Sequence, residues 1–243
     1  MLWCWIGCAA AVFALLFFVR APYGRYVRRG WGPLVGRRTG WILMELPSAI
    51  GMPLAFWLGN RHTDTAAIVF LSLWSVHYFH RTFIYPLGLA RGQGHTLTTV
   101  AMAWVFNSAN VFFNGYWLFH AGPVLGASWL GDPRFVAGLV VFVAGFVACK
   151  HSDAILRRLR RNNPGEYKIP EGGLFRWISC PNYLGEIVEW LGWAILTWSL
   201  AGLSFAIWTV ANLAPRAWHH HRWYMERFAE YPKNRKALVP FIF

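Results

Sequence analysis

Long apolar stretches, separated by short polar segments, recur along the whole chain. A helix that crosses the hydrocarbon core of a bilayer needs about 20 mostly apolar residues, or somewhat fewer when long polar side chains at its ends reach the interface. Seven stretches meet this requirement, at about residues 2–19, 41–59, 66–87, 97–119, 134–150, 183–199 and 202–215. The pattern predicts an all-α integral membrane protein with seven transmembrane helices, in which residues 1–243 form a single domain.

The first apolar stretch is similar to a secretory signal peptide. A signal peptide carries positive charge ahead of its apolar region. Here no basic residue precedes the stretch, and Arg20 follows it at once. We therefore expect residues 2–19 to be a retained helix.

Basic residues are distributed unevenly between the connecting segments. Of the 23 lysines and arginines, only Arg61 and Arg134 lie on one side, and all the others lie in or beside the segments that follow the first, third, fifth and seventh stretches. Cytoplasmic segments carry the excess of Lys and Arg. We therefore expect the N-terminus outside and the C-terminus in the cytosol, in the inner membrane of a prokaryote or the endoplasmic reticulum of a eukaryote.

Composition supports the membrane class and excludes several others. Charged residues make up 14% of the chain and hydrophobic residues 56%, whereas soluble domains contain about 25% charged residues. This balance excludes disordered proteins, soluble Rossmann enzymes and disulfide scaffolds. The net charge of +13 does not indicate a nucleic-acid partner, because the basic residues lie between apolar stretches and do not form one surface. We interpret the four cysteines as packing residues.

Glu45 is an ionisable residue inside the second stretch, near Pro47 and Pro53. Charged groups at membrane depth are costly and mark candidate functional sites. Each proline also frees a backbone carbonyl in the preceding turn. A carboxylate at the interface, hydrated or paired with an arginine of a loop, would produce the same pattern.

The third stretch carries a stripe of aromatic and basic residues: Trp74, Tyr78, Arg81 and Tyr85. Their spacing places them on one face of a helix, whereas His77 and His80 point elsewhere. Packing alone would account for Trp74. A phenol beside a guanidinium indicates function for Tyr78 and Arg81.

The fourth stretch carries a stripe of amides: Asn107, Asn110 and Asn114. Hydrogen bonds between helices would explain this spacing as well as a binding site would.

The cytosolic half of the chain carries further polar stripes. Asn182, Glu186 and Glu189 share one face of the sixth stretch, and two carboxylates there need cations or donors nearby. We expect these partners from the end of the seventh stretch: Arg216, His220 and Arg222.

Asp153, Arg157 and Arg160 repeat this spacing below the fifth stretch, where a solvated, salt-bridged helix face would look the same. His219, His220 and His221 are adjacent, so they point about 100° apart on a helix and cannot hold one metal ion together. We expect no metal site.

Together these residues suggest a cavity with two linings. The cytosolic lining is rich in Arg, Asn and Glu and suits a ligand with phosphates and an amide. The deeper lining is aromatic, with one phenol and one carboxylate, and suits a flat apolar ligand with one polar handle.

Six separated motifs, in order, resemble the steroid 5α-reductase family: Glu45-Leu-Pro47, Val76-His-Tyr-Phe-His-Arg-Thr-Phe83, Lys150-His-Ser-Asp153, Pro181-Asn-Tyr-Leu-Gly-Glu186, Arg216-Ala-Trp-His-His-His-Arg-Trp-Tyr224 and Tyr231-Pro-Lys-Asn-Arg-Lys-Ala-Leu238. The resemblance runs from about residue 40 to the end of the chain. It implies a seven-helix, NADPH-dependent reductase of the carbon–carbon double bond in 3-oxo-Δ4 steroids of the testosterone and progesterone type, with 5α-dihydro steroids as products.

The resemblance also implies roles for individual residues. Tyr78 and Glu45 would hydrogen-bond the steroid C3 carbonyl while hydride reaches C5 and a proton reaches C4. A phenol suits this role, whereas a carboxyl must be protonated or oriented by a neighbour. The resemblance points to Asp153, Arg160, Tyr167, Asn182, Glu186, Arg216, His220 and Tyr224 as cofactor ligands, to which we add Arg157, Arg235, Arg81 and Asn110.

Two motifs depart from the family's pattern. Cys149 stands where the family often has asparagine, and the family's Asn-Arg-Gly-Arg appears as Ala90-Arg-Gly-Gln93. One amide and one guanidinium that could contact the cofactor are therefore replaced. The chain also lacks the glycine fingerprint of a Rossmann site, so we expect NADPH to bind between helices and cytosolic loops.

Other functions remain open on the sequence. A reductase of another sterol or enone differs only in the double bond that it reduces. A membrane methyltransferase of the isoprenylcysteine type shares the architecture, but S-adenosylmethionine has no phosphate to occupy the arginines. A transporter or a lipid-binding scaffold would also fill a membrane cavity with polar groups. A transporter, however, commonly shows inverted repeats and broken helices, and neither is visible here. We expect a monomer that contacts membrane lipids and takes its steroid from them.

Overall fold

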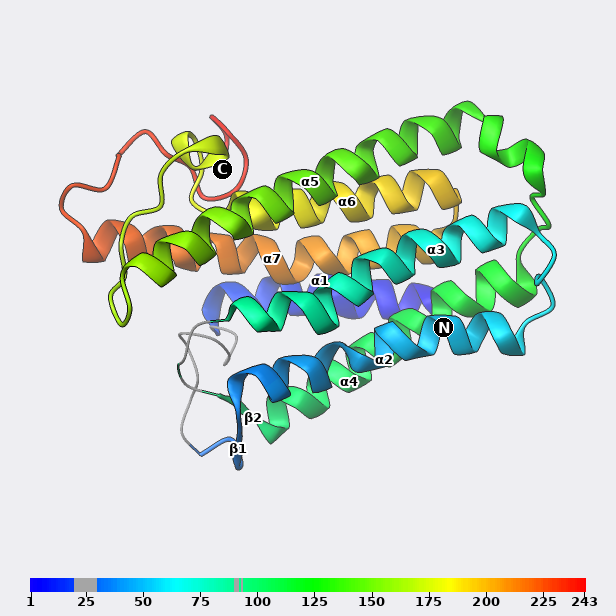
Figure 1. The fold of residues 1–243 in the computed structure, drawn as a ribbon, viewed down its shortest axis with the longest axis horizontal. Coiled ribbons are helices and arrows are strands. Elements are labelled where there is room, and N and C mark those ends of the chain that lie inside the picture. Colours follow the sequence, from blue (N-terminus) through cyan, green and yellow to red (C-terminus); the bar gives the residue numbers. More distant parts are fainter. Residues whose placement is uncertain (20–29, 90–91, 93) are drawn as a thin grey trace. The chain divides into compact units, whose positions relative to one another are not determined.

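A computed structural model describes residues 1–19, 30–89, 92 and 94–243. This part of the chain is mostly helical (Figure 1). It contains seven α-helices: α1 (Leu2–Phe18), α2 (Arg37–Leu58), α3 (Thr65–Phe79), α4 (Leu97–Tyr116), α5 (Pro133–Asn162), α6 (Pro181–Thr197) and α7 (Leu200–Arg227). The seven helices predicted from the apolar pattern are therefore confirmed.

Two helices differ from the predicted stretches in their length. The expected stretches 134–150 and 202–215 are only the apolar parts of α5 and α7, which continue to Asn162 and Arg227. The apolar pattern alone does not mark these ends, because a helix can continue past the apolar segment when its later residues are polar but favour helix. The connection to α6 holds only a short 3₁₀ turn, Gly173–Arg176.

Two short features were not predicted from the sequence. The two-residue strands β1 (Leu34–Val35) and β2 (His95–Thr96) pair antiparallel. α3 and α4 each continue into a π-helical turn, at His80–Ile84 and Trp117–Ala121. Such turns often occur at functional sites.

Two helices, α2 and α5, are long and apolar enough to cross a membrane by length and composition, and α1 is a shorter apolar helix. These helices agree with a membrane protein. That all seven helices cross the membrane stays a prediction.

The chain forms two compact units, and each is described by itself. The first unit comprises Met1–Ala21, Ala137–Leu196 and Gly202–Phe243, and the second comprises Pro22–Val136 and Thr197–Ala201. α1, α6, α7 and most of α5 thus belong to the first unit, and α2, α3 and α4 to the second. The single-domain prediction stays a prediction.

In the first unit, glycines bring α5 and α6 into backbone contact. A Cβ atom on Gly145 would lie 2.2 Å from the backbone nitrogen of Glu189, and one on Gly185 would lie 2.4 Å from that of Cys149. Gly138 and Gly192 make similar approaches. Because no side chain fits at these positions, the two helices pack through their main chains.

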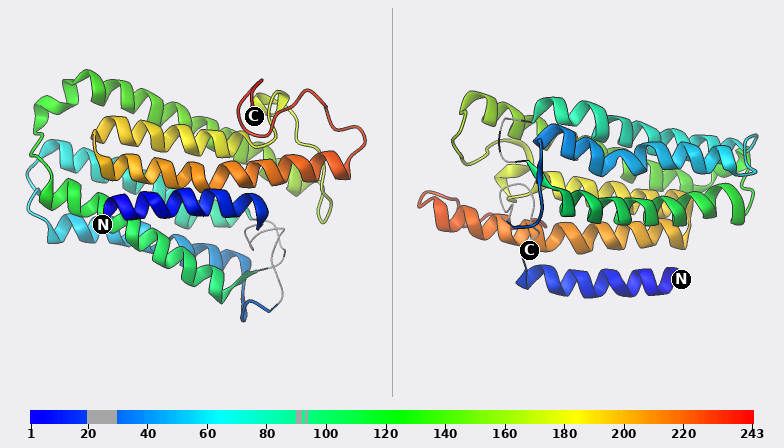
Figure 2. Two further views of the ribbon diagram at one scale, coloured as in Figure 1. Left: turned by 180° about the vertical axis from the view of Figure 1, so that it is seen from behind. Right: turned by 90° about the horizontal axis from the view of Figure 1, so that it is seen from below.

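α1 runs beside α7 in both views of Figure 2. Trp208 Nε1 donates a hydrogen bond to the Trp5 carbonyl at 3.1 Å, and the two indole rings lie 4.5 Å apart. Near the other end, a ring nitrogen of His219 lies 2.9 Å from the Leu16 carbonyl oxygen. The first apolar stretch is thus a packed helix of this unit.

In the second unit, side chains of α4 hydrogen-bond to the backbone of α2 around Pro47. Proline at position 47 has no N–H, so the Leu43 carbonyl loses its usual helical donor. Trp104 Nε1 donates to that carbonyl at 2.6 Å, and Asn107 Nδ2 donates to the next one, that of Met44, at 2.7 Å. The carbonyl that the proline frees therefore anchors α4 to α2.

Candidate active site

Glu45 and Arg81 form an ion pair inside the second unit. Arg81 Nε lies 3.3 Å from Glu45 Oε1, and both side chains are largely buried. The guanidinium also lies over the rings of Trp41, at 4.7 Å, and Tyr85, at 5.5 Å. The sequence left open a pairing of Glu45 with an arginine of a loop, and the partner is instead an arginine in the π-helical turn after α3. The Glu45 carboxyl is thereby oriented by a neighbour.

Tyr78 is held rigidly one turn before this pair. Its ring stacks on Trp74 at 4.9 Å between centroids, and Trp74 Nε1 donates to the Ser48 carbonyl of α2 at 3.0 Å. Both aromatic residues are buried, as is His77, whose ring meets the edge of Tyr78. The predicted stripe is therefore confirmed for Trp74 and Tyr78, but His77 does not point away from it.

The asparagines of α4 act mainly on backbone carbonyls. Asn107 bonds to α2, and Asn114 Nδ2 donates to Ala201 at 3.4 Å as well as to Asn110. Asn110 Nδ2 donates to Phe106 in its own helix at 3.0 Å. Bonds between elements thus explain Asn107 and Asn114, whereas Asn110 is buried without such a bond among the contacts of the described chain.

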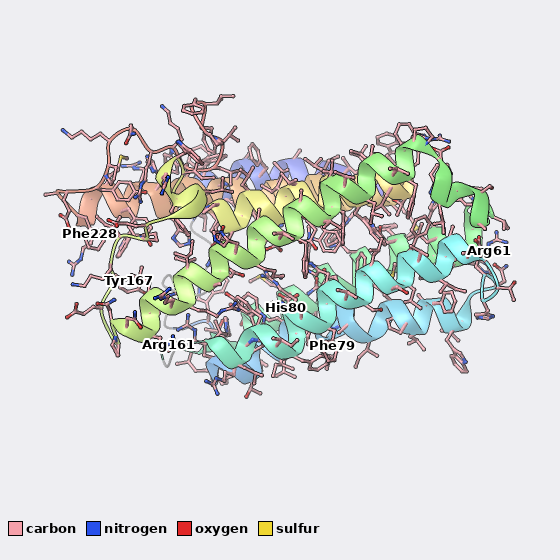
Figure 3. The ribbon with its side chains drawn as sticks, turned by 45° about the horizontal axis from the view of Figure 1, so that its top comes forward. Arg61, Phe79, His80, Arg161, Tyr167 and Phe228 are labelled. Carbon is pink, nitrogen blue, oxygen red and sulfur yellow. The ribbon has the colours of Figure 1, made fainter. Side chains whose placement is uncertain are left out.

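A cavity of about 230 Å³ lies at the end of the second unit that contains Asp64, Trp129 and Arg134. Arg61, between α2 and α3, lies at the far end of α3 from His80 (Figure 3). The cavity lining includes neither Tyr78 nor Glu45. It therefore plays no part in the candidate site.

In the first unit, Asp153 and Asn182 link α5 to the first turn of α6. Asn182 Nδ2 donates to Asp153 Oδ1 at 3.3 Å, and the aspartate is 4% exposed. Gly185 allows this contact because it lets α6 approach the α5 backbone at Cys149. Two predicted cofactor residues, distant in sequence, are thus brought together.

Tyr183 joins α6 to α7, and the sequence analysis did not single it out. Arg216 Nε donates to the Tyr183 hydroxyl at 2.8 Å, and that hydroxyl lies 3.2 Å from His220 Nε2. The sequence feature that could have identified Tyr183 is its place in the Pro181–Glu186 motif, next to Asn182. The Tyr183 hydroxyl thus contacts two further predicted cofactor residues, Arg216 and His220.

One of the expected cation partners of the α6 carboxylates, Arg222, was wrong. Arg222 pairs with Glu226 at 3.5 Å, and both side chains are more than half exposed. Arg222 is therefore a surface residue, because its position on α7 directs it to solvent. Glu189 is fully buried in α6, and Glu186 is half-buried.

The three adjacent histidines have three different partners. His219 contacts Leu16, His220 contacts Tyr183, and His221 Nδ1 lies 2.6 Å from the Ser179 hydroxyl. Their side chains diverge as expected for neighbours on a helix.

Ser179 connects the start of α6 to the C-terminal tail. Its hydroxyl lies 2.6 Å from the Tyr231 hydroxyl, and its backbone N–H donates to the Lys236 carbonyl at 2.8 Å. Burial raises the pKa of the Tyr231 phenol above its usual value of 10.0, although Ser179 and Arg235 oppose the shift. Arg235 is also buried and donates to the Pro170 carbonyl at 3.0 Å. The tail is therefore tied to the middle and to the end of the segment between α5 and α6.

Two aromatic residues, Tyr167 and Tyr224, complete the predicted cofactor residues of this unit. The half-exposed Tyr167 ring meets Trp223 edge-on at 5.1 Å, and Figure 3 shows it at the same end of the first unit as Phe228. Tyr224 is buried and stacks on Tyr231 at 5.3 Å.

The donors of the first unit fit a dinucleotide. Arg157 and Arg160 are half-buried, and no acceptor on the described residues pairs with them. Nε of the buried Arg235 likewise has no hydrogen-bond partner in the described chain. Guanidinium groups of this kind suit phosphate oxygens, and an amide–carboxylate pair at Asn182 and Asp153 suits a carboxamide.

The two predicted linings fall in different units. Arg81 and Asn110 belong to the second unit with Tyr78 and Glu45. All the other predicted cofactor residues belong to the first unit. Ala90, Arg91 and Gln93 of the departing motif, and Arg20, Arg25, Arg28 and Arg29 of the charge argument, lie outside the described residues.

Comparison with known proteins finds matches over nearly the whole chain. The family described as 3-oxo-5-alpha-steroid 4-dehydrogenase matches residues 93–243. "Steroid 5-alpha-reductase DET2" of Arabidopsis thaliana is 43% identical over 94% of this chain and 90% of its own length. "3-oxo-5-alpha-steroid 4-dehydrogenase 2" of Sus scrofa is 43% identical over 97% of this chain and 93% of its own. The corresponding type 1 protein of Homo sapiens is 38% identical over 99% and 92%.

Proposed function

Because the chain belongs to the 3-oxo-5-alpha-steroid 4-dehydrogenase family of oxidoreductases acting on CH–CH groups, we propose that it reduces the Δ4 double bond of 3-oxo-Δ4 steroids with NADPH. Steroids of the testosterone and progesterone type would give 5α-dihydro products. The observation that carries this proposal is the buried Tyr78 phenol, stacked on Trp74 and one turn from the Glu45–Arg81 pair.

Tyr78 supplies the donor that the reaction needs. Negative charge grows on the C3 carbonyl oxygen as hydride reaches C5, and a preorganised donor in a site closed to water strengthens its bond to that oxygen. Stacking on Trp74 limits the movement of the phenol. Tyr78 thus polarises the carbonyl, and a proton then reaches C4.

Glu45, when protonated, would donate a second hydrogen bond to the carbonyl. Arg81, packed against the rings of Trp41 and Tyr85, holds the carboxyl in one orientation. The resulting site offers one polar end and an aromatic wall, which suits a flat steroid with a single ketone.

The first unit would hold the cofactor through its cytosolic groups. NADPH, when bound, supplies the hydride. Asp153 and Asn182 would hold the nicotinamide carboxamide, and Arg157, Arg160 and Arg216 the phosphates. Tyr183 would keep Arg216 and His220 in place through its hydroxyl.

The distribution of charge supports a placement in the membrane. In this proposal all seven helices cross the bilayer, with the N-terminus outside and the cofactor residues on the cytosolic side. The steroid enters from the lipid, and the protein works as a monomer.

The first test is NADPH oxidation by the purified protein in detergent, with and without testosterone or progesterone, and with the product stereochemistry determined. We expect steroid-dependent oxidation that gives the 5α-dihydro product. Tyr78→Phe should lower kcat/KM by about 100- to 1000-fold, the usual effect of removing one such donor. Tyr116→Phe, at a half-exposed position of α4, is the matched control and should behave as the wild type.

Each negative result has its own meaning. Binding of NADPH without turnover of any 3-oxo-Δ4 steroid contradicts the substrate and favours another enone. Failure to bind NADPH contradicts the cofactor site, and S-adenosylmethionine is then the next ligand to test.

A further inference from the structure

Lys150 carries a buried ammonium group inside α5. Its Nζ atom is fully buried, and no hydrogen-bond acceptor contacts it on the residues that the structure describes. It lies over the ring of Phe146, 4.8 Å from the centroid. The Lys150–Asp153 motif indicated a cofactor role for Asp153, and the sequence suggested no role for Lys150.

A buried ammonium of this kind requires an acceptor. Removing the charge from water is costly, and a cation–π contact compensates for only part of that cost. The cost is higher in α5 than on a soluble helix, because α5 is long and apolar enough to cross a membrane. An ammonium has three donors and accepts nothing, so its partner must offer an oxygen with a free lone pair.

The position of Lys150 on α5 indicates which ligand brings that oxygen. Asp153 and Arg157 follow at offsets of three and seven residues, so the three residues share one helix face. At a rise of about 1.5 Å per residue, Lys150 lies about 4.5 Å before Asp153 and about 10 Å before Arg157 along the helix. Along this face of α5, the buried Lys150 ammonium comes first. The Asp153 carboxylate, which accepts a hydrogen bond from Asn182, follows it, and the Arg157 guanidinium comes last.

This order matches the order of groups along a nicotinamide dinucleotide. The phosphates belong at the arginine-rich end of α5, where Arg157, Arg158, Arg160 and Arg161 lie. The nicotinamide lies at the other end of the cofactor and is the part that must reach an apolar substrate. Its carboxamide oxygen is an uncharged acceptor.

We propose that the Lys150 ammonium donates a hydrogen bond to the carboxamide oxygen of the cofactor's nicotinamide, on the face of α5 that it shares with Asp153. Lys150 is thus a cofactor-binding residue that recognises the nicotinamide end. This inference rests on the proposed NADPH site.

The test measures binding in place of turnover. Dissociation constants for NADPH, NADH and 2′-phospho-ADP-ribose, which lacks the nicotinamide, are determined by quenching of tryptophan fluorescence or by calorimetry. Lys150→Met should weaken NADPH and NADH alike by about 10- to 100-fold, the usual value of a hydrogen bond to a charged group. It should leave the affinity for 2′-phospho-ADP-ribose unchanged. Lys233→Met, at an exposed position of the tail, is the matched control and should change none of the three.

Other outcomes overturn the inference. Wild-type affinity for NADPH in Lys150→Met shows that the ammonium has no role in binding. An equal loss for 2′-phospho-ADP-ribose assigns it to a phosphate. Lys150→Leu, which also lacks a donor, gives a second reading if the methionine variant does not fold, and unchanged NADPH binding there has the same meaning. A wild-type protein that binds S-adenosylmethionine but not NADPH contradicts the proposed function itself.

Discussion

Single hydroxyl groups connect distant parts of the first unit. The Tyr183 hydroxyl contacts Arg216 and His220, and the Ser179 hydroxyl contacts His221 and Tyr231. Each hydroxyl can both donate and accept, so one oxygen joins α6 to α7 or to the tail. The positions of Asn182 and Glu186, between and beyond these two residues, therefore depend on the partners of Ser179 and Tyr183.

Tyr231 gives this network a dependence on pH. Burial raises the pKa of its phenol above 10.0, so the folded protein holds the phenolic proton more tightly than the unfolded chain does. The stabilisation is fully present below pH 10.0 and is lost as the pH rises through the folded value. Thermal unfolding of detergent-solubilised protein should therefore show wild type losing stability relative to Tyr231→Phe above pH 10.0.

The half-exposed Tyr116 supplies the control for this measurement. Tyr116→Phe should keep the wild-type slope of stability against pH. Parallel curves for wild type and Tyr231→Phe above pH 10.0 would show that burial of the phenol does not govern its ionisation.

At the scale of elements, two kinds of contact hold the helix pairs together. α5 and α6 approach through glycines until their backbones touch, whereas α2 and α4 are joined by side-chain donors to backbone carbonyls near Pro47. The first kind of contact leaves no room for a side chain in place of glycine. The second compensates for the hydrogen bond that the proline removes.

Gly145→Ala should disrupt the α5–α6 contact. The added Cβ would lie 2.2 Å from the Glu189 backbone nitrogen and 2.6 Å from the Gly185 carbonyl oxygen, and backbone atoms cannot move aside as a flexible side chain can. We expect a loss of about 1–3 kcal/mol in the free energy of unfolding, the usual cost of overpacking, measured by denaturant titration in detergent.

Gly7→Ala is the matched control, because nothing lies within 4 Å of a Cβ at this position of α1. It should be neutral or stabilising by about 0.5–1 kcal/mol, since alanine favours helix. Equal effects of the two substitutions would show that α5 and α6 pack less closely than the structure indicates.

For the whole molecule, the uneven distribution of charge predicts one orientation in the membrane. Ser128 lies between α4 and α5 on the side that carries Arg61 and Arg134, and Lys233 lies in the C-terminal tail; both side chains are exposed. Ser128→Cys should react with a membrane-impermeant maleimide in intact cells. With the exposed Cys4 and Cys8 replaced by serine in both variants, Lys233→Cys should react only after the cells are made permeable.

Comparing the labelling of Ser128→Cys with that of Lys233→Cys also tests the number of membrane crossings between the two positions. With seven crossings the two positions lie on opposite sides, because α5, α6 and α7 separate them. Labelling of both positions in intact cells, or of Lys233→Cys alone, would contradict the proposed topology.

The sequence by itself determined the helical class, the position of each helix and the family. Apolar runs of membrane length and ordered motifs are local features of the sequence, so they can be recognised without knowledge of how the helices pack. The shared face of Trp74 and Tyr78 and the separate directions of the three histidines were also predictable, because helical spacing places these residues.

Only the tertiary structure decided which partner each polar group meets. Arg81 joins Glu45, Arg222 turns to Glu226, and Tyr183 gathers two α7 residues. Helical periodicity gives the direction of a side chain around its own axis but not the neighbour that lies there, because that depends on helix contacts between residues far apart in sequence. The buried, acceptor-less ammonium of Lys150 became visible for the same reason: burial is a property of the packed chain.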